Sequence, residues 1–240
     1  MRRRTIATSA LFVCAATALT ACSSSGSGSG AGSAKGLVAA KTPAAAAPAA
    51  AKGPYANLTG GQIATNSLNA TRQATSLHLK ADINDAKDGP GKLDLSLNSK
   101  GDCTGTITAG KDTVRIIKVG RTAYLNTQES GGKWTKTDTT SGDGKDLTSV
   151  CDLNKFLGPV QGEDTAAQKG ATTTVGGAPA IVLTEKDGNE SYTMDVATSG
   201  KPYLLKMVAV GGDSPGTLAF SRFGEPVHAV APPKSSIAAG

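Results

Sequence analysis

The sequence is poor in aromatic residues and in histidine. Phe, Trp and Tyr make up 4% of the 240 residues, and the only histidines are His78 and His228. So few aromatic rings argue against a base-stacking surface for nucleic acid. Two histidines provide no cluster of metal ligands. Because no catalytic constellation is recognisable either, we predict a protein that is not an enzyme and has no metal or cofactor.

The sequence also lacks an apolar run long enough to span a membrane. Its longest uncharged apolar stretch, residues 6–21, falls short of the roughly 20 residues that a transmembrane helix needs. The stretch follows Arg2, Arg3 and Arg4 and ends in small residues, which is typical of a secretory signal. We therefore predict a signal peptide over residues 1–21, with the Sec or Tat export route left open.

The end of this signal has the pattern of a bacterial lipobox, Leu19-Thr20-Ala21-Cys22. In a lipobox, a diacylglycerol is joined to the cysteine sulfur before a peptidase cuts on its N-terminal side. We predict that Cys22 is lipidated, with palmitate as an acyl chain, and that it anchors the chain at the extracellular face of the cell membrane. The alternative is an ordinary secreted protein in which Cys22 is incidental.

Positive charge is not concentrated in the mature chain. Loss of three arginines with the signal lowers the formal net charge from +6 to +3, which is too slight to indicate a nucleic-acid partner. Residues 22–57 are rich in Ser and Gly and then in Ala and Pro, without apolar periodicity. Such a composition predicts a disordered tether between the lipidated cysteine and a folded domain.

The remaining cysteines, Cys103 and Cys151, form one pair in an oxidising compartment, where disulfides persist. A bridge between them closes a loop of about 49 residues, which is worth about 4 kcal/mol on the chain-entropy model. A reactive thiol or a metal pair is the alternative. Cys103 has the parity of the apolar residues in its predicted strand, whereas Cys151 lies in a helical pattern over residues 147–157. The predicted disulfide would thus clamp a helix onto a sheet.

The folded domain, predicted over residues 58–235, begins with a helix and continues as strands. Thr59 and Gln62 fit a capping box for a helix that runs to about Thr75. Apolar and polar residues then alternate over residues 77–83 and 93–97, on either side of an Asp-Gly-Pro-Gly turn at residues 88–91. This period of two indicates an antiparallel hairpin with one buried face.

Further strands follow at short spacing, which gives an α+β fold class built on a curved, mostly antiparallel sheet (a half-barrel) with a few helices over its concave face. Ile116 and Ile117 break the alternation and predict a bulge or a sharp bend. Trp134 is predicted to pack in the core or at a cavity rim. The additional predicted strands are 103–108, 113–119, 122–127, one near 134, 172–175, 180–184, 192–196, 203–210 and 218–223.

Three motifs invite a chemical interpretation. Ser214 lies in a Gly-Asp-Ser-Pro-Gly segment with some likeness to a nucleophile turn, but Pro215 removes the backbone N–H that follows the serine, and a hairpin turn is the favoured reading. The acidic segment 82–89 faintly resembles a calcium loop but lacks its terminal glutamate. His78 alternates with apolar residues on a strand and has no identifiable catalytic partner.

Several short motifs of the folded domain carry a family resemblance. They are Val119-Gly-Arg-Thr-Ala-Tyr-Leu125 followed by Trp134, Val175-Gly-Gly-Ala-Pro-Ala180, Lys201-Pro-Tyr-Leu-Leu-Lys206 and Phe223-Gly-Glu-Pro-Val227. Together these motifs resemble the actinobacterial LppX/LprG lipoproteins, which are relatives of the LolA/LolB carriers. A smaller segment pair, residues 101–105 with 151–153, resembles a set of uncharacterised actinobacterial lipoproteins.

This resemblance implies a half-barrel whose concave face encloses an apolar cavity for acyl chains. It therefore predicts a carrier or binding protein for a lipid or another apolar ligand. The alternative is an envelope protein-interaction module with a solid core and no ligand. The chain differs from the lipid carriers in its predicted disulfide and in its small number of large apolar residues. The residues expected to line the ligand site are Leu93, Leu95, Leu97, Ile116, Leu205 and Met207.

Overall fold

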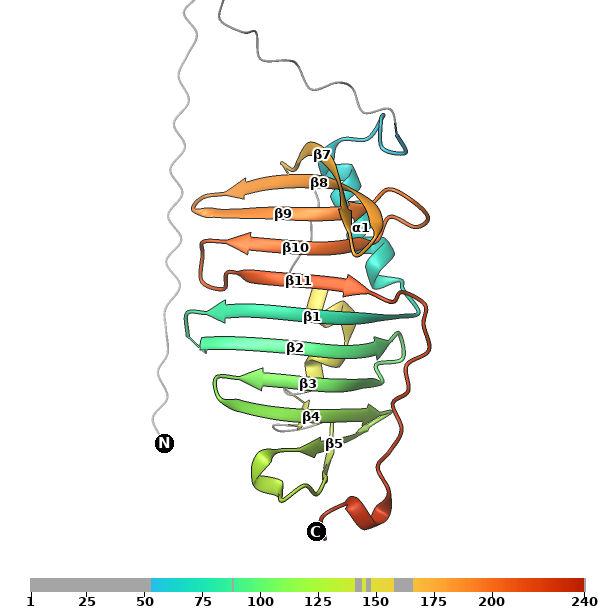
Figure 1. Cartoon of the computed structure of the whole chain (residues 1–240), viewed down its shortest axis with the longest axis vertical. Helices are drawn as coiled ribbons and strands as arrows, with labels where there is room; N and C mark the ends of the chain where they lie inside the picture. Colours follow the sequence, from blue (N-terminus) through green and yellow to red (C-terminus); the bar gives the residue numbers. More distant parts are fainter. Residues whose placement is uncertain (1–52, 88, 141–143, 146–147, 158–165, 240) are drawn as a thin grey trace, which may run out of the picture. The chain divides into compact units, whose positions relative to one another are not determined.

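The computed structural model in Figure 1 describes residues 53–87, 89–140, 144–145, 148–157 and 166–239. The predicted signal peptide, the predicted lipidation site Cys22 and most of the predicted tether lie outside the described residues. The description therefore concerns the folded domain. Residues 53–57, at the end of the predicted tether, contain Tyr55, which is packed against the main core and whose hydroxyl donates a hydrogen bond to the Ala197 carbonyl.

The domain is built on one open sheet of eleven strands in which every neighbouring pair is antiparallel (Figure 1). The sheet order is β6-β5-β4-β3-β2-β1-β11-β10-β9-β8-β7. The strands are β1 (Ser76–Asp85), β2 (Gly89–Asn98), β3 (Cys103–Ala109), β4 (Asp112–Val119), β5 (Thr122–Asn126), β6 (Thr135–Asp138), β7 (Gln168–Val175), β8 (Ala178–Asp187), β9 (Glu190–Ala197), β10 (Leu204–Val210) and β11 (Gly216–Ser221).

The order shows two meanders joined by one seam. Strands β1 to β6 follow one another in space as in sequence, and so do β7 to β11. The seam is the β1–β11 pair, where Leu79 lies opposite Phe220. The predicted curved antiparallel half-barrel is confirmed, and the predicted strands correspond to observed ones within a few residues.

Helix α1 (Gly60–Arg72) forms where the capping box predicts it. The Thr59 hydroxyl accepts from the Gln62 N–H at 3.1 Å, and the Gln62 side chain accepts from the Thr59 N–H at 2.9 Å. These bonds satisfy two N–H groups that a helix start leaves without partners. The helix buries Ile63 and Leu68 against the sheet and ends at Arg72, shorter than the predicted limit near Thr75.

One main core fills the space between the sheet and its helices. Alternation along β1 and β2 sends every second side chain to this face. The helical contributions come from α1, from the 3-10 turn η2 (Ser149–Cys151) and from the short helix α3 (Leu153–Leu157). A buried bond fixes α1 to the sheet: the Leu204 N–H donates to the Thr71 hydroxyl at 2.9 Å.

The irregularity expected at Ile116-Ile117 lies elsewhere. The pairing of β4 with both neighbours is continuous, so the predicted bulge there is wrong. Ile116 faces the core, and Ile117 is half-buried on the other face. The register instead shifts in β10 between Leu204 and Lys206, which leaves Leu205 as the extra residue, and in β7 between Lys169 and Thr172. Two apolar residues are adjacent in β4 because the second face of this strand is also partly covered. In the sequence, a strand covered on both faces and a bulged strand show the same break in alternation.

A second, smaller apolar cluster lies apart from the main core. It contains Leu205 with Ala180 and Ala197, and the stacked rings of Tyr203 and Phe223 pack against it with their centroids 3.9 Å apart. Strand β10 thus contributes Leu204 to one cluster and Leu205 to the other. The start of β10 is therefore covered on both faces.

The segment after β11 runs along the ends of the strands from the middle of the sheet to the end at which β5 lies (Figure 1). It contains the 3-10 turn η3 (Lys234–Ser236), and Ile237 after this turn forms a parallel bridge with Trp134, the residue before β6. The Trp134 N–H donates to the Ser236 carbonyl at 2.8 Å, and the Ala238 N–H donates to the Trp134 carbonyl at 2.9 Å. Trp134 is half-buried, with the Arg115 guanidinium 5.4 Å from its ring centroid.

Candidate functional site: the apolar concave face

Apolar side chains form continuous rows across the concave face, because paired residues of an antiparallel sheet point to the same side. We call the row that crosses the middle of the strands the outer row and the next one toward the disulfide the inner row. The outer row is Met194, Met207, Leu218, Ala81, Leu93, Ile107 and Val114. The inner row is Phe220, Leu79, Leu95, Gly105, Ile116 and Leu125.

The two rows differ in exposure. At the centre of the inner row, Leu79, Leu95 and Ile116 have no solvent-accessible surface, while Gly105 and Leu125 toward one end of the row are half-buried. Met207 and Leu218 in the outer row retain 9% each, and further along the row Leu93, Ile107 and Val114 are only half-buried. The outer row is therefore an apolar strip that lies at the margin of the packed core.

Gly105 is a necessary gap in the inner row. Its φ is +152°, and a Cβ there would lie 2.0 Å from the Asp94 carbonyl oxygen. Only glycine permits this approach of β3 to β2. Leu95 and Ile116, which flank Gly105 in the row, are both fully buried, whereas Gly105 itself is half-buried.

The six residues predicted to line a ligand site fall into three groups. Leu95, Leu97 and Ile116 are fully packed core residues, at most 1% exposed. Leu93 and Met207 belong to the partly open outer row. The structure places Leu205 in the second cluster, away from the other five.

Sequence reasoning did not select Ile107, Val114 or Leu218, which extend the outer row across neighbouring strands. The tight turn between two of these strands would have shown that Ile107 and Val114 lie opposite each other. Because Ala109 pairs with Asp112 around a two-residue turn, counting back two residues along each strand brings Ile107 opposite Val114. Counting from turns would thus have assigned both residues to one row.

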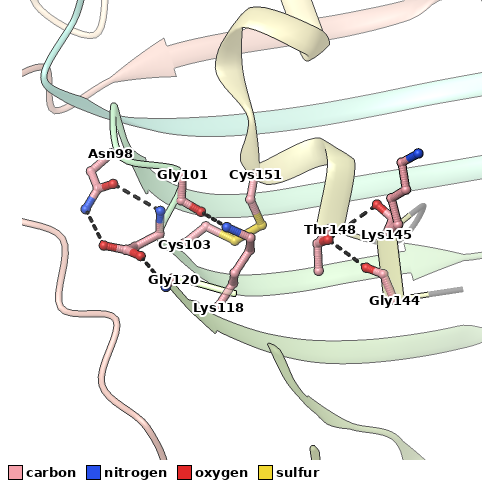
Figure 2. Close-up of a disulfide and its surroundings, with 10 residues drawn as sticks. Asn98, Gly101, Cys103, Lys118, Gly120, Gly144, Lys145, Thr148 and Cys151 are labelled. Atoms are coloured by element: carbon pink, nitrogen blue, oxygen red, sulfur yellow. Dashed lines mark hydrogen bonds between the residues drawn. A yellow bond between two sulfur atoms is a disulfide. The ribbon is translucent and has the colours of Figure 1, made fainter. Parts of the chain in front are cut away.

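The disulfide predicted between Cys103 and Cys151 is present at the covered end of the concave face (Figure 2). Cys103 begins β3, Cys151 ends η2, and both are fully buried in the main core. The bond closes a chain segment with a sequence separation of 48. It holds the short helices against the sheet, as predicted for a bridge between these two cysteines.

Polar bonds fix the turn beside the disulfide (Figure 2). The Gly120 N–H donates to an Asp102 carboxylate oxygen at 2.8 Å, and the Asn98 amide donates to the other oxygen at 3.2 Å. Bonds to the charged form, that from Gly120 first, hold the pKa of Asp102 below its ordinary value. The Lys118 ammonium donates to the Gly101 carbonyl at 2.6 Å, which places one cation at this end of the concave face.

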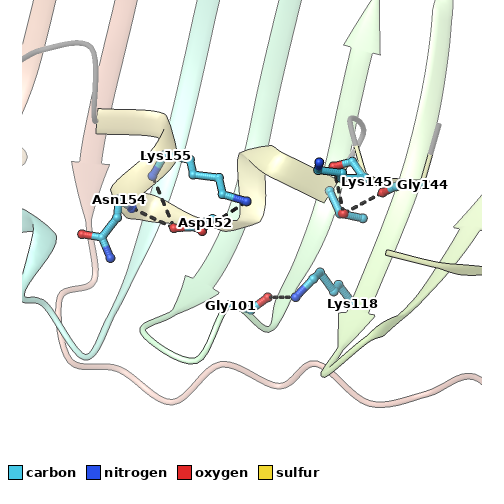
Figure 3. Close-up of polar contacts among 8 residues, drawn as sticks. Gly101, Lys118, Gly144, Lys145, Asp152, Asn154 and Lys155 are labelled. Atoms are coloured by element: carbon cyan, nitrogen blue, oxygen red, sulfur yellow. Dashed lines mark hydrogen bonds and ion pairs between the residues drawn. The ribbon is translucent and has the colours of Figure 1, made fainter. Parts of the chain in front are cut away.

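Helix α3 is capped by a side chain and lies across the strands (Figure 3). One oxygen of Asp152 accepts from the N–H groups of Asn154 and Lys155 at 3.1 and 3.3 Å. The Lys155 ammonium lies 3.8 Å from the other oxygen. A polar depression of about 200 Å³ adjoins this cap and is lined by Arg72, Asn98, Ser99, Lys100, Gly101, Cys151, Asp152, Leu153 and Asn154.

The convex face gives His78 two partners that sequence reasoning did not identify. Its Nδ1 lies 3.0 Å from the Ser96 hydroxyl, and its Nε2 lies 3.1 Å from an Asp94 oxygen whose carboxylate also binds Lys80 at 3.1 Å. The signal was available, because Ser96 is the residue opposite His78 in the predicted hairpin. Burial outweighs the attraction of Asp94 and lowers the pKa of His78.

This Ser96–His78–Asp94 arrangement has the order of a hydrolytic triad but a different setting. All three residues lie on the adjacent strands β1 and β2, at regular ladder positions. Backbone N–H groups in a ladder are already bonded to the neighbouring strand, so they are not available to stabilise an oxyanion. We interpret the cluster as a cross-strand polar network that covers the convex face.

The motif residues near the far strand ends have structural roles. Ser214 lies in the connection between β10 and β11, where a hairpin turn was predicted, and its hydroxyl donates to Asp85. Asp88 of the predicted calcium-like segment lies outside the described residues. No group of three metal-ligating side chains occurs among the residues that the structure describes. In the same part of the chain, no helix has the length and hydropathy needed to cross a membrane.

Fold and concave face together define a class: an open antiparallel half-barrel whose apolar face is covered by short helices and clamped by a disulfide. Two solved structures, one of them of a lipoprotein, share the half-barrel architecture. LprF from Mycobacterium bovis is 16% identical with a TM-score of 0.58, and the match covers 72% of this chain and 96% of that one. LppX from Mycobacterium tuberculosis is 17% identical with a TM-score of 0.54, and the match covers 71% and 97%.

The resemblance to LppX/LprG-type lipoproteins is thus confirmed at the level of the fold. Sequence comparisons add nothing to it, since no family model and no curated protein matches the chain. At 16–17% identity the agreement concerns the architecture of the domain. What this chain binds has to be argued from its own residues.

Proposed function

We propose that this protein is a membrane-anchored lipoprotein, held at the outer face of the membrane by diacylglycerol on Cys22, that binds or carries an apolar ligand such as a lipid and catalyses no reaction. The observation that carries the binding proposal is the outer row. It is a strip of apolar side chains across seven strands that changes from nearly buried at Met207 to half-buried at Leu93 and Ile107.

The outer row suits an acyl chain for a physical reason. Covering half-exposed Leu and Ile side chains with hydrocarbon removes apolar surface from water, at roughly 25 cal/mol per Å². The row includes Met207 and Met194, whose unbranched side chains adapt to ligands of different shape. The fold shared with LprF and with the lipoprotein LppX supports the same proposal.

The buried centre of the inner row limits the mode of binding. Leu95 and Ile116 have no contact with solvent, so a ligand reaches them only if the helical layer moves. The disulfide restricts such movement near Cys151. We therefore place the ligand on the outer row rather than beneath η2 and α3. If the core never opens and the outer row binds nothing, the alternative applies, which is a protein-interaction module with a solid core and no ligand.

Binding is tested with cis-parinaric acid, a fluorescent fatty acid, on the purified chain. We expect saturable binding that weakens at least tenfold in a Leu93→Gln, Ile107→Gln variant. The matched control is Val119→Gln, an apolar residue of β4 that is 38% exposed. Native mass spectrometry of the protein as isolated should detect a co-purifying lipid. Absence of both a bound lipid and saturable binding would reject the carrier proposal in favour of the interaction module.

Anchoring is tested separately with the Cys22→Ser variant in the producing bacterium. We expect the parent protein to incorporate an alkyne-labelled palmitate and to sediment with membranes. The variant should lose the label and leave the membrane fraction once its signal has been cleaved. A processed Cys22→Ser protein that still sedimented with membranes would contradict a lipid anchor on this residue.

A further inference from the structure

The two edges of the sheet are protected to different degrees. The β6 edge is only four residues long, has Lys136 and Asp138 on it, and begins beside Trp134, which pairs with the C-terminal segment. Short length, charge and a covering segment are the usual means by which an edge avoids pairing with another chain. At the other edge, β7 has a register shift between Lys169 and Thr172 but pairs with β8 without interruption from Thr172 to Val175. The strand is exposed along nearly its whole length, and residues 170–177 contain no charge.

The turn after β7 determines which backbone groups point outward. Gly176 and Gly177 both have positive φ, +55° and +85°, as a two-residue type I′ turn requires. In such a hairpin the flanking residues Val175 and Ala178 exchange both hydrogen bonds. Hydrogen-bonded and non-hydrogen-bonded pairs alternate from there. Thr174, opposite Pro179, is therefore a non-hydrogen-bonded position.

Pro179 agrees with this assignment, because a proline can donate no bond to β7. By the same alternation, Thr172, opposite Ile181, is also a non-hydrogen-bonded position. The N–H and C=O groups of Thr172 and Thr174 consequently point away from β8. Among the residues that the structure describes, β8 is the only strand paired with β7.

We infer that β7 is a self-association surface that pairs in antiparallel fashion with β7 of a second copy of this chain, about a two-fold axis at Thr173. The outward groups of Thr172 then lie opposite those of Thr174 in the second copy, and the reverse pair is equivalent. This arrangement forms four N–H to C=O bonds. Thr173 lies opposite itself at a non-hydrogen-bonded position, where the two side chains are close.

A second copy fits this edge for two reasons. The outward groups are related by the two-fold axis itself, so the edge is its own complement, as an isologous dimer requires. No charged residue between Gly170 and Gly177 opposes a like charge in the pair, and the three paired threonines are β-branched residues that suit cross-strand contacts. A contact of this length buries far less than the roughly 1,000 Å² of a stable interface, so the association is weak and depends on concentration.

A cysteine at the axis tests the register. Thr173→Cys places two thiols at a non-hydrogen-bonded antiparallel pair, whose Cα atoms lie about 4.5 Å apart, within disulfide range. The full chain is used with Cys14→Ser and Cys22→Ser, so that no lipid is attached and one free thiol remains. We expect a covalent dimer to form under mild oxidation at least tenfold faster than with Thr135→Cys, the control on the exposed β6 edge.

Adding Thr174→Pro to the Thr173→Cys chain removes an outward N–H without removing a bond to β8, so the cross-link should be lost. Adding Thr174→Val, which keeps the N–H, should preserve it. Sedimentation velocity on chains without the new thiol gives an independent measurement: Thr173→Lys should abolish self-association, and Thr135→Lys should not. Equal cross-linking at positions 173 and 135, or self-association unchanged by Thr173→Lys, would overturn the inference.

Discussion

The two faces of the sheet are stabilised by different interactions. On the concave face, Leu95 and its neighbours are sealed beneath helices and a disulfide. On the convex face, cross-strand pairs such as Lys92 with Asp82 remain largely in water. The comparison teaches that stability is concentrated in the inner row and its clamp. The half-buried end of the outer row, from Leu93 to Val114, and the exposed ion pairs of the convex face should therefore change with a smaller effect on folding.

The largest effect is expected from the clamp of the concave face. Replacing Cys103 and Cys151 together by alanine should lower the free energy of unfolding by about 4 kcal/mol, because the unfolded chain regains the entropy of a long loop. Denaturant unfolding of the variant and the parent measures the difference. A loss below about 1 kcal/mol would mean that the helices are held by packing alone.

The inner row should show the next largest effect. Leu95→Ala removes a fully buried side chain and leaves a cavity, so the free energy of unfolding should fall by about 3 kcal/mol. Thermal and denaturant unfolding should agree on this value. A tolerated Leu95→Ala would show that the inner row is not the packed centre of the domain.

Leu93→Ala is the matched test in the outer row, two residues away on the same strand. Because Leu93 is only half-buried, its truncation should cost about 1 kcal/mol. The ratio of the two losses, measured under identical conditions, gives the contrast between the rows. Equal losses would remove the distinction on which the proposed ligand site rests.

His78 tests the convex face through pH. Its pKa is lowered in the folded protein, chiefly by burial of a side chain that is 13% exposed, so the unfolded chain takes up the proton first on acidification. The free energy of unfolding should therefore fall as pH drops below about 6.5, the ordinary histidine value. His78→Asn should flatten this dependence between about pH 7 and 5.5. An unchanged profile would show that His78 binds protons equally in both states.

The smallest effect is expected at the exposed ion pair. Lys92 and Asp82 lie 2.9 Å apart, but their side chains are 63% and 64% exposed. Lys92→Ala should change the free energy of unfolding by about 0.5 kcal/mol or less, since water screens the attraction. Measurements at low and high salt should bracket that value, and a loss above about 1 kcal/mol would indicate a network stronger than the geometry suggests.

Local patterns predicted most of the fold. Thr59 and Gln62 defined the helix start because a capping box depends on four consecutive residues, and alternation around Leu79 and Leu95 predicted the central hairpin. The Cys103–Cys151 bond followed from there being one pair left in the folded domain. The capping box and the alternation each depend on a short stretch of chain, and the disulfide depends only on the number of cysteines.

The details of the concave face depend on partners distant in sequence. Leu205 was grouped with Met207 because the shift of one residue in β10 is not visible in an apolar run. Ile117 seemed to break a strand because its burial on the second face comes from neighbouring strands. The cluster around His78 could have been predicted from the register of one hairpin. The β1–β11 pairing could not, because the two strands are far apart in sequence.

The seam determines the order in which the domain can be completed. The meander from β1 to β6 can form as soon as it is synthesised, but the inner edge of β1 has no neighbour until β11, near the end of the chain, is made. Helix α1 also cannot pack until late, because it packs against β9 and β10, which are synthesised long after it. The first helix of the folded domain thus reaches its native packing among the last events of biosynthesis, and a chain stopped before β9 exposes both its apolar face and an unpaired strand.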